Sequence, residues 1–437
     1  MNTHPEIINN KSNPKLIYFL CNGFPTISET FVINQISNAK NYGFRIKIHA
    51  DYINHLDKPL LENDPVISEM LSRTHVRCKT PDKIIKRIFL ALAMAKEKSA
   101  LIQFAKSINI FRFGKSALNL RNFFSYSSFL GNENPDIVHA QFGPNGVKAV
   151  NAKLNNVIKC PIVTSFHGYD AHTEPSTLSK SQKYYSNLFR HGDLFLVNGN
   201  YLQKQLEALG CPIDKIIQLP IGVDLNKFKL SSSRPKIENG DIRLITIGRL
   251  IKLKNQEFGI KLLSLIRAKG INATYTIIGS GPEFENLKSL AKSLNVEKYV
   301  QFLGSLSQKE ILKILPQHHI FLMTSYKDDA GRMETQGIVS AEAQACGLPV
   351  ITLGFGGTAD TIIHGVTGFN LLSSNPEAAI SYLREIIDPK TYAKFSVNAR
   401  DFISENYDIK ITNKRLIKIY RDLIISSENK SILKKSN

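Results

Sequence analysis

Short apolar runs alternate with amphipathic stretches along most of the chain. In the first half, the runs that read as buried strands lie at 16–20, 45–50, 137–140, 162–166, 194–197 and 216–219. Between them, apolar residues recur every three or four positions, as Phe31, Val32, Ile36 and Ala39 do. This spacing predicts helices, among them 28–42, 143–157 and 201–209. Strands that alternate with helices indicate βαβ units and a parallel sheet.

The same pattern starts again in the second half of the chain. Strands are predicted at 242–247, 273–278, 300–303, 320–323 and 350–353, with a helix at 256–268. The polar, aperiodic stretch 229–240 separates the two halves. The sequence therefore predicts an α/β fold with two Rossmann-like, doubly wound parallel-sheet domains, 15–230 and 241–405. A helix is expected at 406–428, between a disordered lead (1–14) at one end of the chain and a basic tail (429–437) at the other.

Composition narrows the class of protein. Of the 437 residues, 43% are hydrophobic and 21% charged, as in ordinary globular proteins. The five cysteines are scattered without metal-ligand spacing, which fits a reducing compartment. The polar N-terminus predicts no signal peptide, and the longest apolar run, Ile88–Ala95, is far shorter than the ~20 residues of a membrane span. We therefore expect a cytoplasmic protein.

The formal net charge of +19 predicts an anionic partner. Nucleic acid, anionic lipid and the phosphates of a nucleotide sugar all fit. Much of the charge falls in 81–132, where nine basic residues are interleaved with Phe104, Phe111, Phe113, Phe123 and Phe124. An apolar stripe that includes Ile84, Ile88 and Leu92 runs through the same region. Such a basic amphipathic region is typical of a helix on a membrane surface, and the alternative is a helical pair packed on the sheet.

The densest group of chemical signals lies between Met323 and Asp360. Two glutamates, Glu334 and Glu342, stand eight residues apart, and the second falls in a predicted helix of small residues. Gly347 and Pro349 end that helix. The strand 350–353 follows, and then a glycine-rich turn. Because ligands bind at the carboxyl ends of parallel strands, we expect both glutamates at a ligand-binding edge.

Other candidates also follow predicted strands. The strand 162–166 leads into His167-Gly168-Tyr169-Asp170, and His139 at the end of the preceding strand is a weaker candidate for the same cleft. In the second half, Arg249 follows 242–247, and Lys254 comes five residues later. The sequence contains no Asp-x-Asp pair for a metal. Fixed cations and helix N-termini are the metal-free way to stabilise a departing diphosphate.

These motifs resemble the signatures of retaining glycosyltransferases with the GT-B fold, family 4, in particular enzymes that build exopolysaccharide, capsule and colanic acid. The spacing of Glu334 and Glu342, the run Gly347-Leu348-Pro349-Val350 and the Gly-Gly turn match. Asp360 stands where the family usually has Glu. The resemblance implies that the two domains face each other across a cleft and that the terminal helix crosses back to the N-terminal domain.

The resemblance also implies roles for individual residues. Glu342 would accept hydrogen bonds from the ribose, Glu334 would contact the donor sugar, and His167 would lie against the same sugar, so His167 and Glu334 are the catalytic candidates. Arg249 and Lys254 would hold the diphosphate. The other donor-binding candidates are backbone positions: Gly23, Gly279, Gly281, Gln336, Gly337 and Ile338.

The implied reaction moves a hexose from a nucleotide-diphosphate sugar, UDP-linked by expectation, to a polyprenyl-diphosphate-linked saccharide acceptor. No cofactor and no metal are expected, and the enzyme would work at the inner face of the plasma membrane, bound peripherally to its anionic surface. A GT-B nucleotide-sugar epimerase or phosphorylase is the alternative. Nucleic-acid binding rests on charge alone, because no nucleic-acid module is present in the sequence.

Overall fold

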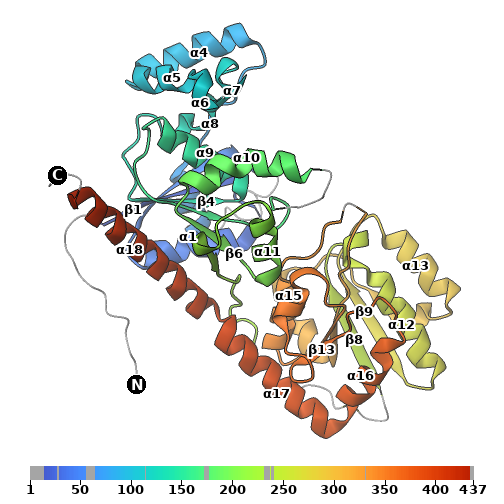
Figure 1. The fold of residues 1–437 in the computed structure, drawn as a ribbon. Coiled ribbons are helices and arrows are strands. Elements are labelled where there is room, and N and C mark those ends of the chain that lie inside the picture. The colour runs from blue at the N-terminus through green and yellow to red at the C-terminus, as the bar shows by residue number, and fades with distance from the viewer. Residues whose placement is uncertain are drawn as a thin grey trace, which may run out of the picture. The chain divides into compact units, whose positions relative to one another are not determined.

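The chain forms two compact units, neither of which is continuous in sequence (Figure 1). The computed structural model describes residues 14–26, 29–55, 64–113, 115–171, 177–230, 237, 241–329 and 331–433. The first unit contains the chain up to Val197, the segment Leu206–Ile217 and the chain from Asn413 onward. The second contains Asn198–Gln205 and Gln218–Thr412.

A seven-stranded parallel sheet in the order β3-β2-β1-β4-β5-β6-β7 forms the core of the first unit. Its central strands β1, β4 and β5 are almost wholly buried, as expected for a parallel sheet covered on both faces. The strands are β1 Leu16–Phe24, β2 Arg45–Ile53, β3 Thr74–Val76, β4 Ile137–Gln141, β5 Ile162–Ser165, β6 Leu194–Val197 and β7 Ile216–Gln218.

The helices that connect these strands follow the apolar spacing of the sequence. In α1, for example, Val32, Ile33, Ile36 and Ala39 form the buried face. The α-helices up to the linker are α1 Thr30–Asn41, α3 Pro65–Ser72, α4 Ile84–Glu97, α5 Leu101–Ser107, α6 Ile110–Phe113, α7 Lys115–Leu118, α8 Arg121–Ser125, α9 Gly143–Leu154, α10 Leu178–His191 and α11 Asn200–Ala208.

The second unit repeats the design with six parallel strands in the order β10-β9-β8-β11-β12-β13. The strands are β8 Ile242–Ile247, β9 Ala273–Ile278, β10 Val300–Phe302, β11 Ile320–Met323, β12 Val350–Thr352 and β13 Gly368–Asn370. The helices are α12 Gln256–Ala268, α13 Phe284–Ser293, α14 Gln308–Ile314, α15 Ile338–Ala345, α16 Ala378–Ile387 and α17 Pro389–Asn406. Two parallel-sheet α/β domains are thus confirmed.

The chain ends with a helix of 25 residues, α18 (Ile409–Leu433). It is anchored in the second unit at its start, where Ile409 N donates to Val223 O at 3.0 Å. From Asn413 on it belongs to the first unit. The predicted disordered tail at 429–437 is wrong for its first five residues, which are helical. The last four positions of that tail and residues 1–13 of the predicted lead lie outside the described residues.

The predicted domain limits at 230 and 241 also differ from the structure. The segment Asn198–Gln205 and the residues after Gln218 belong to the second unit. Hydrogen bonds explain the difference, because Val223 N donates to Tyr407 O at 2.7 Å and Asn200 N to Asp360 Oδ2 at 2.8 Å. Most of the polar stretch 229–240 lies outside the described residues.

Candidate active site

The carboxyl end of β8 packs tightly against the loop that follows β9. Gly248 N donates to Ile278 O and Leu250 N to Ser280 O, each at 2.9 Å. A Cβ added at Gly279 would lie 1.9 Å from Gly248 O, and one added at Gly281 would lie 2.3 Å from Leu250 O. Both glycines also have positive φ, so a side chain is disfavoured by the backbone conformation as well as by the lack of space. They keep this loop in place beside Arg249.

Lys254 closes a short 3-10 turn, η4 (Lys252–Lys254), after β8. Its ammonium group donates to the Glu334 carboxylate, and the two side chains are only 18% and 22% exposed. The backbone is fixed as well, because Thr324 Oγ1 donates to Lys254 O at 2.7 Å. The structure thus brings together two predicted site residues from distant parts of the sequence.

The glycine-rich turn after β12 supports the segment that carries Glu334. Gly357 N donates to Glu334 O at 2.7 Å. A Cβ at Gly357 would lie 1.9 Å from Thr335 O, and one at Gly356 would lie 2.2 Å from Glu334 O. The turn therefore sets the position of the Glu334 backbone, and only glycine fits at these two places.

Gly337 ends this segment in the left-handed conformation, with φ +73°, and α15 begins at Ile338. The N–H groups of a first helical turn have no partner within the helix and carry partial positive charge. The side chain of Gln336 is already occupied, because it donates to Ile221 O and accepts from Ile221 N, each at 2.9 Å. Of Gln336, only the backbone is left for a ligand.

Glu342 and Arg249 differ from the paired residues nearby. Within the described chain, no hydrogen-bond or ion-pair partner is present for either side chain. Arg249 is exposed, whereas Glu342 is partly buried in the middle of α15. Burial raises the pKa of the Glu342 carboxyl to about 7. A partly buried carboxyl without a partner is suited to bind hydroxyl groups of a ligand.

Asp360 has a role that the sequence did not indicate. Its carboxylate accepts from Asn200 N at 2.8 Å and from Asn200 Nδ2 at 3.3 Å, at the start of α11. Its carbonyl oxygen accepts from the Tyr407 hydroxyl at 2.6 Å. Asp360 therefore caps α11 and holds Asn198–Gln205 in the second unit.

In the first unit, His167 follows β5 as predicted. Its Nε2 lies 2.9 Å from Gln141 Oε1, and its ring packs between Phe31 and Phe142, with centroids 4.6 and 4.7 Å away. The Asp170 carboxylate accepts from the backbone N–H of His167 and of Gly168, at 3.0 and 2.9 Å, which fixes the turn. Burial lowers the pKa of His167 to about 3, so the ring is neutral at pH 7.

Two candidates of the first unit lie within strands of its sheet. Gly23, expected as a donor-binding backbone position, lies in β1, where its missing side chain leaves room for the Tyr52 ring, 2.7 Å from a hypothetical Cβ. His139 does not line a cleft. It is fully buried, with Nδ1 2.6 Å from the Tyr420 hydroxyl and Nε2 2.8 Å from Ser165 Oγ. It ties α18 to the sheet.

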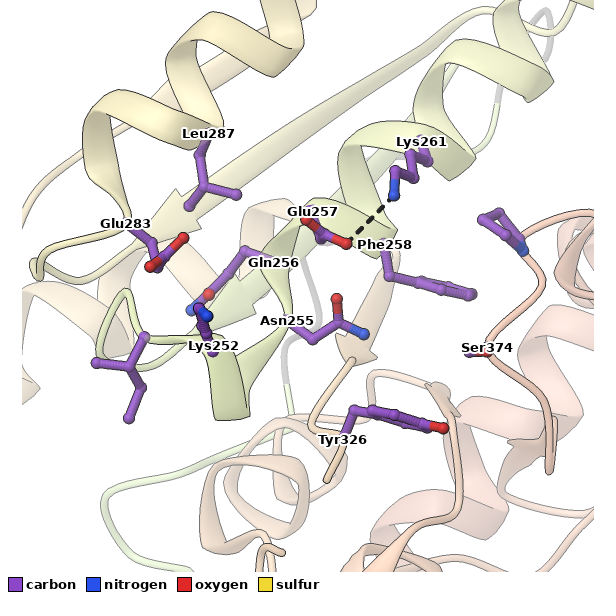
Figure 2. A pocket seen from close by; sticks show the side chains of 12 residues that line it. Lys252, Asn255, Gln256, Glu257, Phe258, Lys261, Glu283, Leu287, Tyr326 and Ser374 are labelled. Carbon is purple, nitrogen blue, oxygen red and sulfur yellow. Dashed lines mark hydrogen bonds and ion pairs between the residues drawn. The ribbon is translucent and has the colours of Figure 1, made fainter. Parts of the chain in front are cut away.

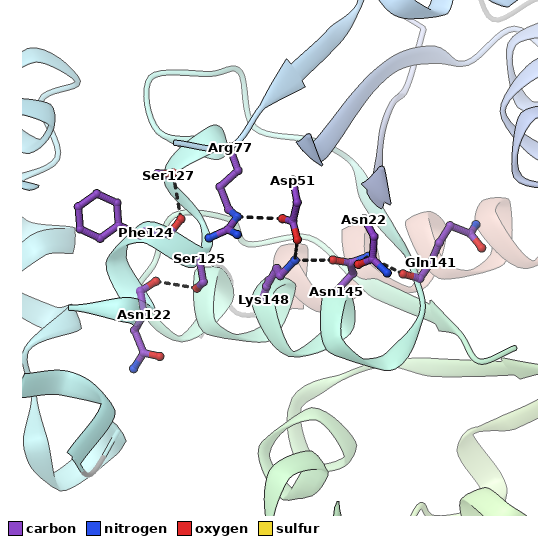
Figure 3. Close-up of polar contacts among 10 residues, drawn as sticks. All are labelled: Asn22, Asp51, Arg77, Asn122, Phe124, Ser125, Ser127, Gln141, Asn145 and Lys148. Atoms are coloured by element: carbon purple, nitrogen blue, oxygen red, sulfur yellow. Dashed lines mark hydrogen bonds and ion pairs between the residues drawn. The ribbon is translucent and has the colours of Figure 1, made fainter. Parts of the chain in front are cut away.

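Sequence reasoning missed a polar network at the carboxyl ends of β1, β2 and β4 (Figure 3). Asp51 accepts from Arg77 Nε at 2.8 Å and from Lys148 Nζ at 2.6 Å, and Lys148 also donates to Asn145 Oδ1 at 2.8 Å. Asn145 Nδ2 in turn donates to Asn22 Oδ1 at 3.1 Å. Burial lowers the pKa of Lys148, although Asp51 opposes that effect. The members lie far apart in sequence, so no local pattern could indicate the network.

A pocket of about 490 Å³ lies beside η4 and the start of α12 (Figure 2). Lys252, Asn255, Phe258 and Tyr326 are among the residues that line it, and Lys252 pairs with Asp329 at 2.9 Å. It includes none of the predicted site residues, so the pocket is a neighbour of the Lys254–Glu334 pair and not part of it.

Two further features are absent from the described residues. Across those parts of the chain, no three His, Cys, Asp or Glu side chains are grouped so that they could hold a metal ion together. Among the described helices, none combines the length and apolar content that a membrane crossing requires.

Two doubly wound parallel-sheet units, with a basic and an acidic residue paired at a strand end of the second, define the GT-B class of glycosyltransferases. Comparison with known families agrees: residues 89–227 match "Glycosyltransferase Family 4" and residues 228–402 match "Glycosyl transferases group 1". These matches together cover more than half of the chain. The chain therefore contains both of these glycosyltransferase domains and is a glycosyltransferase.

The relatives cover nearly the whole chain. The amylovoran biosynthesis glycosyltransferase AmsK of Erwinia amylovora is 28% identical over 84% of this chain and 89% of its own length. WcaL of Salmonella typhimurium, a provisionally assigned colanic acid biosynthesis glycosyltransferase, is 27% identical over 94% of this chain and 100% of its own length. The solved structure of Anabaena HepE with UDP is similar in fold, with a TM-score of 0.68 and 21% identity over 94% of this chain and 100% of that one.

Proposed function

We propose that this glycosyltransferase acts in exopolysaccharide biosynthesis, where it moves a hexose with retention from a UDP-linked donor to a polyprenyl-diphosphate-linked saccharide. AmsK and WcaL support the pathway, since their names place them in amylovoran and colanic acid biosynthesis. HepE supports the donor, because it has been solved with UDP and with UDP-glucose.

The contact that carries this proposal is the ion pair between Lys254 and Glu334, next to the amino end of α15. In the structure, the two charges neutralise each other. A donor diphosphate would attract Lys254 and Arg249, while the first-turn N–H groups after Gly337 would donate hydrogen bonds to its oxygens. Glu334, released from Lys254, would then be available to a sugar hydroxyl.

The remaining candidates fit the same donor. Glu342 would accept hydrogen bonds from the ribose hydroxyls, because its carboxyl group has no partner among the described residues. His167, neutral because of its pKa of about 3, would exchange hydrogen bonds with the donor sugar and would not supply a charge. We assign no residue as general base.

Charge stabilisation by Arg249, Lys254 and helix N–H groups would make a metal unnecessary for departure of the diphosphate. The reaction is expected to survive treatment with a chelator. Loss of activity with rescue by a divalent cation would contradict the metal-free part of the proposal and leave the donor assignment standing.

The decisive experiment measures sugar transfer from UDP-glucose, UDP-galactose and GDP-mannose to lipid-linked saccharide acceptors, with the anomeric configuration of the product determined by NMR. Transfer from a UDP-hexose with retained configuration supports the proposal. Conversion of the nucleotide sugar without any acceptor, or phosphorolysis of a glycoside, would overturn it in favour of an epimerase or a phosphorylase.

A further inference from the structure

Helices α4 to α7 stand apart from the sheet of the first unit as a separate layer (Figure 1). The layer is joined to the sheet through α8, whose Phe123 and Phe124 are fully buried. Phe104 of α5 packs on Phe123, with ring centroids 5.5 Å apart. One side of this layer is therefore packed against the rest of the first unit.

The apolar pattern of α4 is reversed relative to a normal surface helix. Its fully buried residues are Ala91 and Ala95, whereas Ile85 is 65% and Phe89 is 71% exposed. Large apolar residues normally point to the core, because their burial stabilises the fold most. Here small residues face inward, and large ones face outward at helical spacing.

The neighbouring helices also carry exposed large apolar residues. In the described chain, eleven of the twenty-five exposed large hydrophobic residues fall between positions 84 and 118. We define the apolar face as these eleven: Ile84, Ile85, Ile88, Phe89, Leu92, Leu101, Ile102, Ile108, Ile110, Phe111 and Leu118. An apolar surface of this extent marks an interaction site.

Basic side chains accompany the apolar face. Lys83, Lys86, Lys96 and Lys98 are all exposed on or beside α4, and among the described residues only Lys98 of these four has an acidic partner, Glu97 at 2.8 Å. Arg87 has a structural role instead, because it donates to the carbonyl oxygens of Asp82 and Asn119 at 3.0 and 3.1 Å. The side chains of Arg112 and Lys115 lie outside the described residues.

We propose that the apolar face inserts into the interfacial region of an anionic lipid bilayer, with the exposed lysines on its phosphate groups. Large apolar side chains on one face with lysines beside them are what an interfacial helix needs. A second copy of the chain fits less well, since it would place these lysines opposite the same lysines of the copy. The inference does not depend on the proposed reaction, because binding to lipid needs neither donor nor acceptor.

The test is co-sedimentation of the full chain with vesicles, either of phosphatidylcholine alone or of equal parts phosphatidylcholine and phosphatidylglycerol. The wild-type chain should bind the anionic vesicles, and binding should weaken with salt. The variant Ile85→Ser/Phe89→Ser/Ile102→Ser should lose binding on the order of tenfold or more. Its thermal unfolding midpoint should not fall, because the three side chains are 65, 71 and 69% exposed.

The matched control is Ile213→Ser/Val397→Ser/Ile425→Ser, which removes three apolar residues of similar exposure (63, 52 and 56%) from other helices. It should bind vesicles as the wild type does. Equal binding by the Ile85/Phe89/Ile102 variant and the wild type would overturn the proposal. A dimer interface would overturn it too. In that case the wild type would be a dimer in analytical ultracentrifugation, the Ile85/Phe89/Ile102 variant would be a monomer, and neither protein would bind vesicles.

Discussion

The ammonium group of Lys254 is bound to the carboxylate of Glu334, a residue 80 positions further along the chain. Both side chains are mostly buried, and in the second unit each comes from a segment held by backbone contacts, Lys254 through Thr324 and Glu334 through Gly357. A pair held in this way places one positive and one negative group at a fixed point. Replacing either partner therefore changes what the other can bind.

Replacing Lys254 or Glu334 should shift UDP affinity in opposite directions. Lys254→Met removes a cation and leaves Glu334 as an unopposed negative charge, so UDP should bind about ten- to hundredfold more weakly. Glu334→Gln frees Lys254, so UDP should bind as well as to the wild type or better, while transfer falls about hundredfold or more. Calorimetry of UDP binding and steady-state kinetics measure the two effects.

Lys252→Met is the control for this prediction. Lys252 is the neighbour of Lys254 on η4 and has its own partner, Asp329, but both side chains of that pair are exposed. UDP affinity should be unchanged in this variant. Equal weakening of UDP binding in the Lys254 and Glu334 variants would contradict the assignment of Lys254 to the diphosphate.

Binding of UDP-glucose should depend on the protonation of Glu342. Its pKa is raised to about 7 by burial, and a carboxylate accepts hydroxyl hydrogens better than a carboxylic acid does. Affinity should therefore rise as the pH passes upward through about 7. In Glu342→Gln this dependence should disappear, and the affinity should be low throughout. A wild-type affinity that is flat from pH 6 to pH 8 would contradict the role of Glu342.

The same raised pKa predicts how stability depends on pH. In the unfolded chain a glutamate ionises near its ordinary pKa of about 4.3, so between that value and about 7 the folded state holds a proton that the unfolded state has lost. Stability contributed by this group is thus lost as the pH rises through that window. Glu342→Gln should be about 1–2 kcal/mol more stable than the wild type at pH 8.5 and no different near pH 4, measured by thermal unfolding.

Alanine at Gly357 should damage the site more than alanine at an unconfined glycine. An added Cβ would lie 1.9 Å from Thr335 O, so the backbone that carries Glu334 must move. We expect a loss of about 2–3 kcal/mol in unfolding free energy and loss of measurable UDP binding. Gly365→Ala is the comparison, since nothing lies within 4 Å of its Cβ and only its φ of +74° opposes the change. That variant should lose about 1 kcal/mol and bind UDP normally.

Tyr420→Phe should destabilise the first unit. The Tyr420 hydroxyl is 2.6 Å from Nδ1 of the buried His139, and its removal leaves a polar ring nitrogen without that partner in the core. The expected loss is about 1–3 kcal/mol in thermal or denaturant unfolding. Tyr382→Phe is the control, because the Tyr382 ring contributes by stacking on Phe369, at 4.3 Å, and phenylalanine keeps that contact. An unchanged stability of Tyr420→Phe would refute the role of His139 as an anchor for α18.

Much of the fold could be predicted from sequence, because parallel strands such as Leu194–Val197 and Ile320–Met323 are continuous apolar runs. The site could be predicted in part, since strand ends, glycines and glutamates have local spacing. Local spacing does not show which distant residues contact each other. The contacts of Lys254 with Glu334, of the Gln336 side chain with the Ile221 backbone, and of His139 with Tyr420 could therefore not be predicted. Nor does local spacing reveal that α4 buries its alanines and exposes Phe89, because the alanines and the larger residues are both apolar.

Because neither unit is continuous in sequence, the enzyme cannot be cut into halves at the polar linker. A hybrid that joins the first 230 residues of this chain to the rest of a relative would separate Asn200 from Asp360 and His139 from Tyr420. A donor-specificity graft needs four junctions instead, so that Asn198–Gln205 travels with the second unit, while Leu206–Ile217 and the chain after Thr412 stay with the first. Each unit is built from segments that are separate in sequence, and any exchange of a unit between relatives has to move all of its segments together.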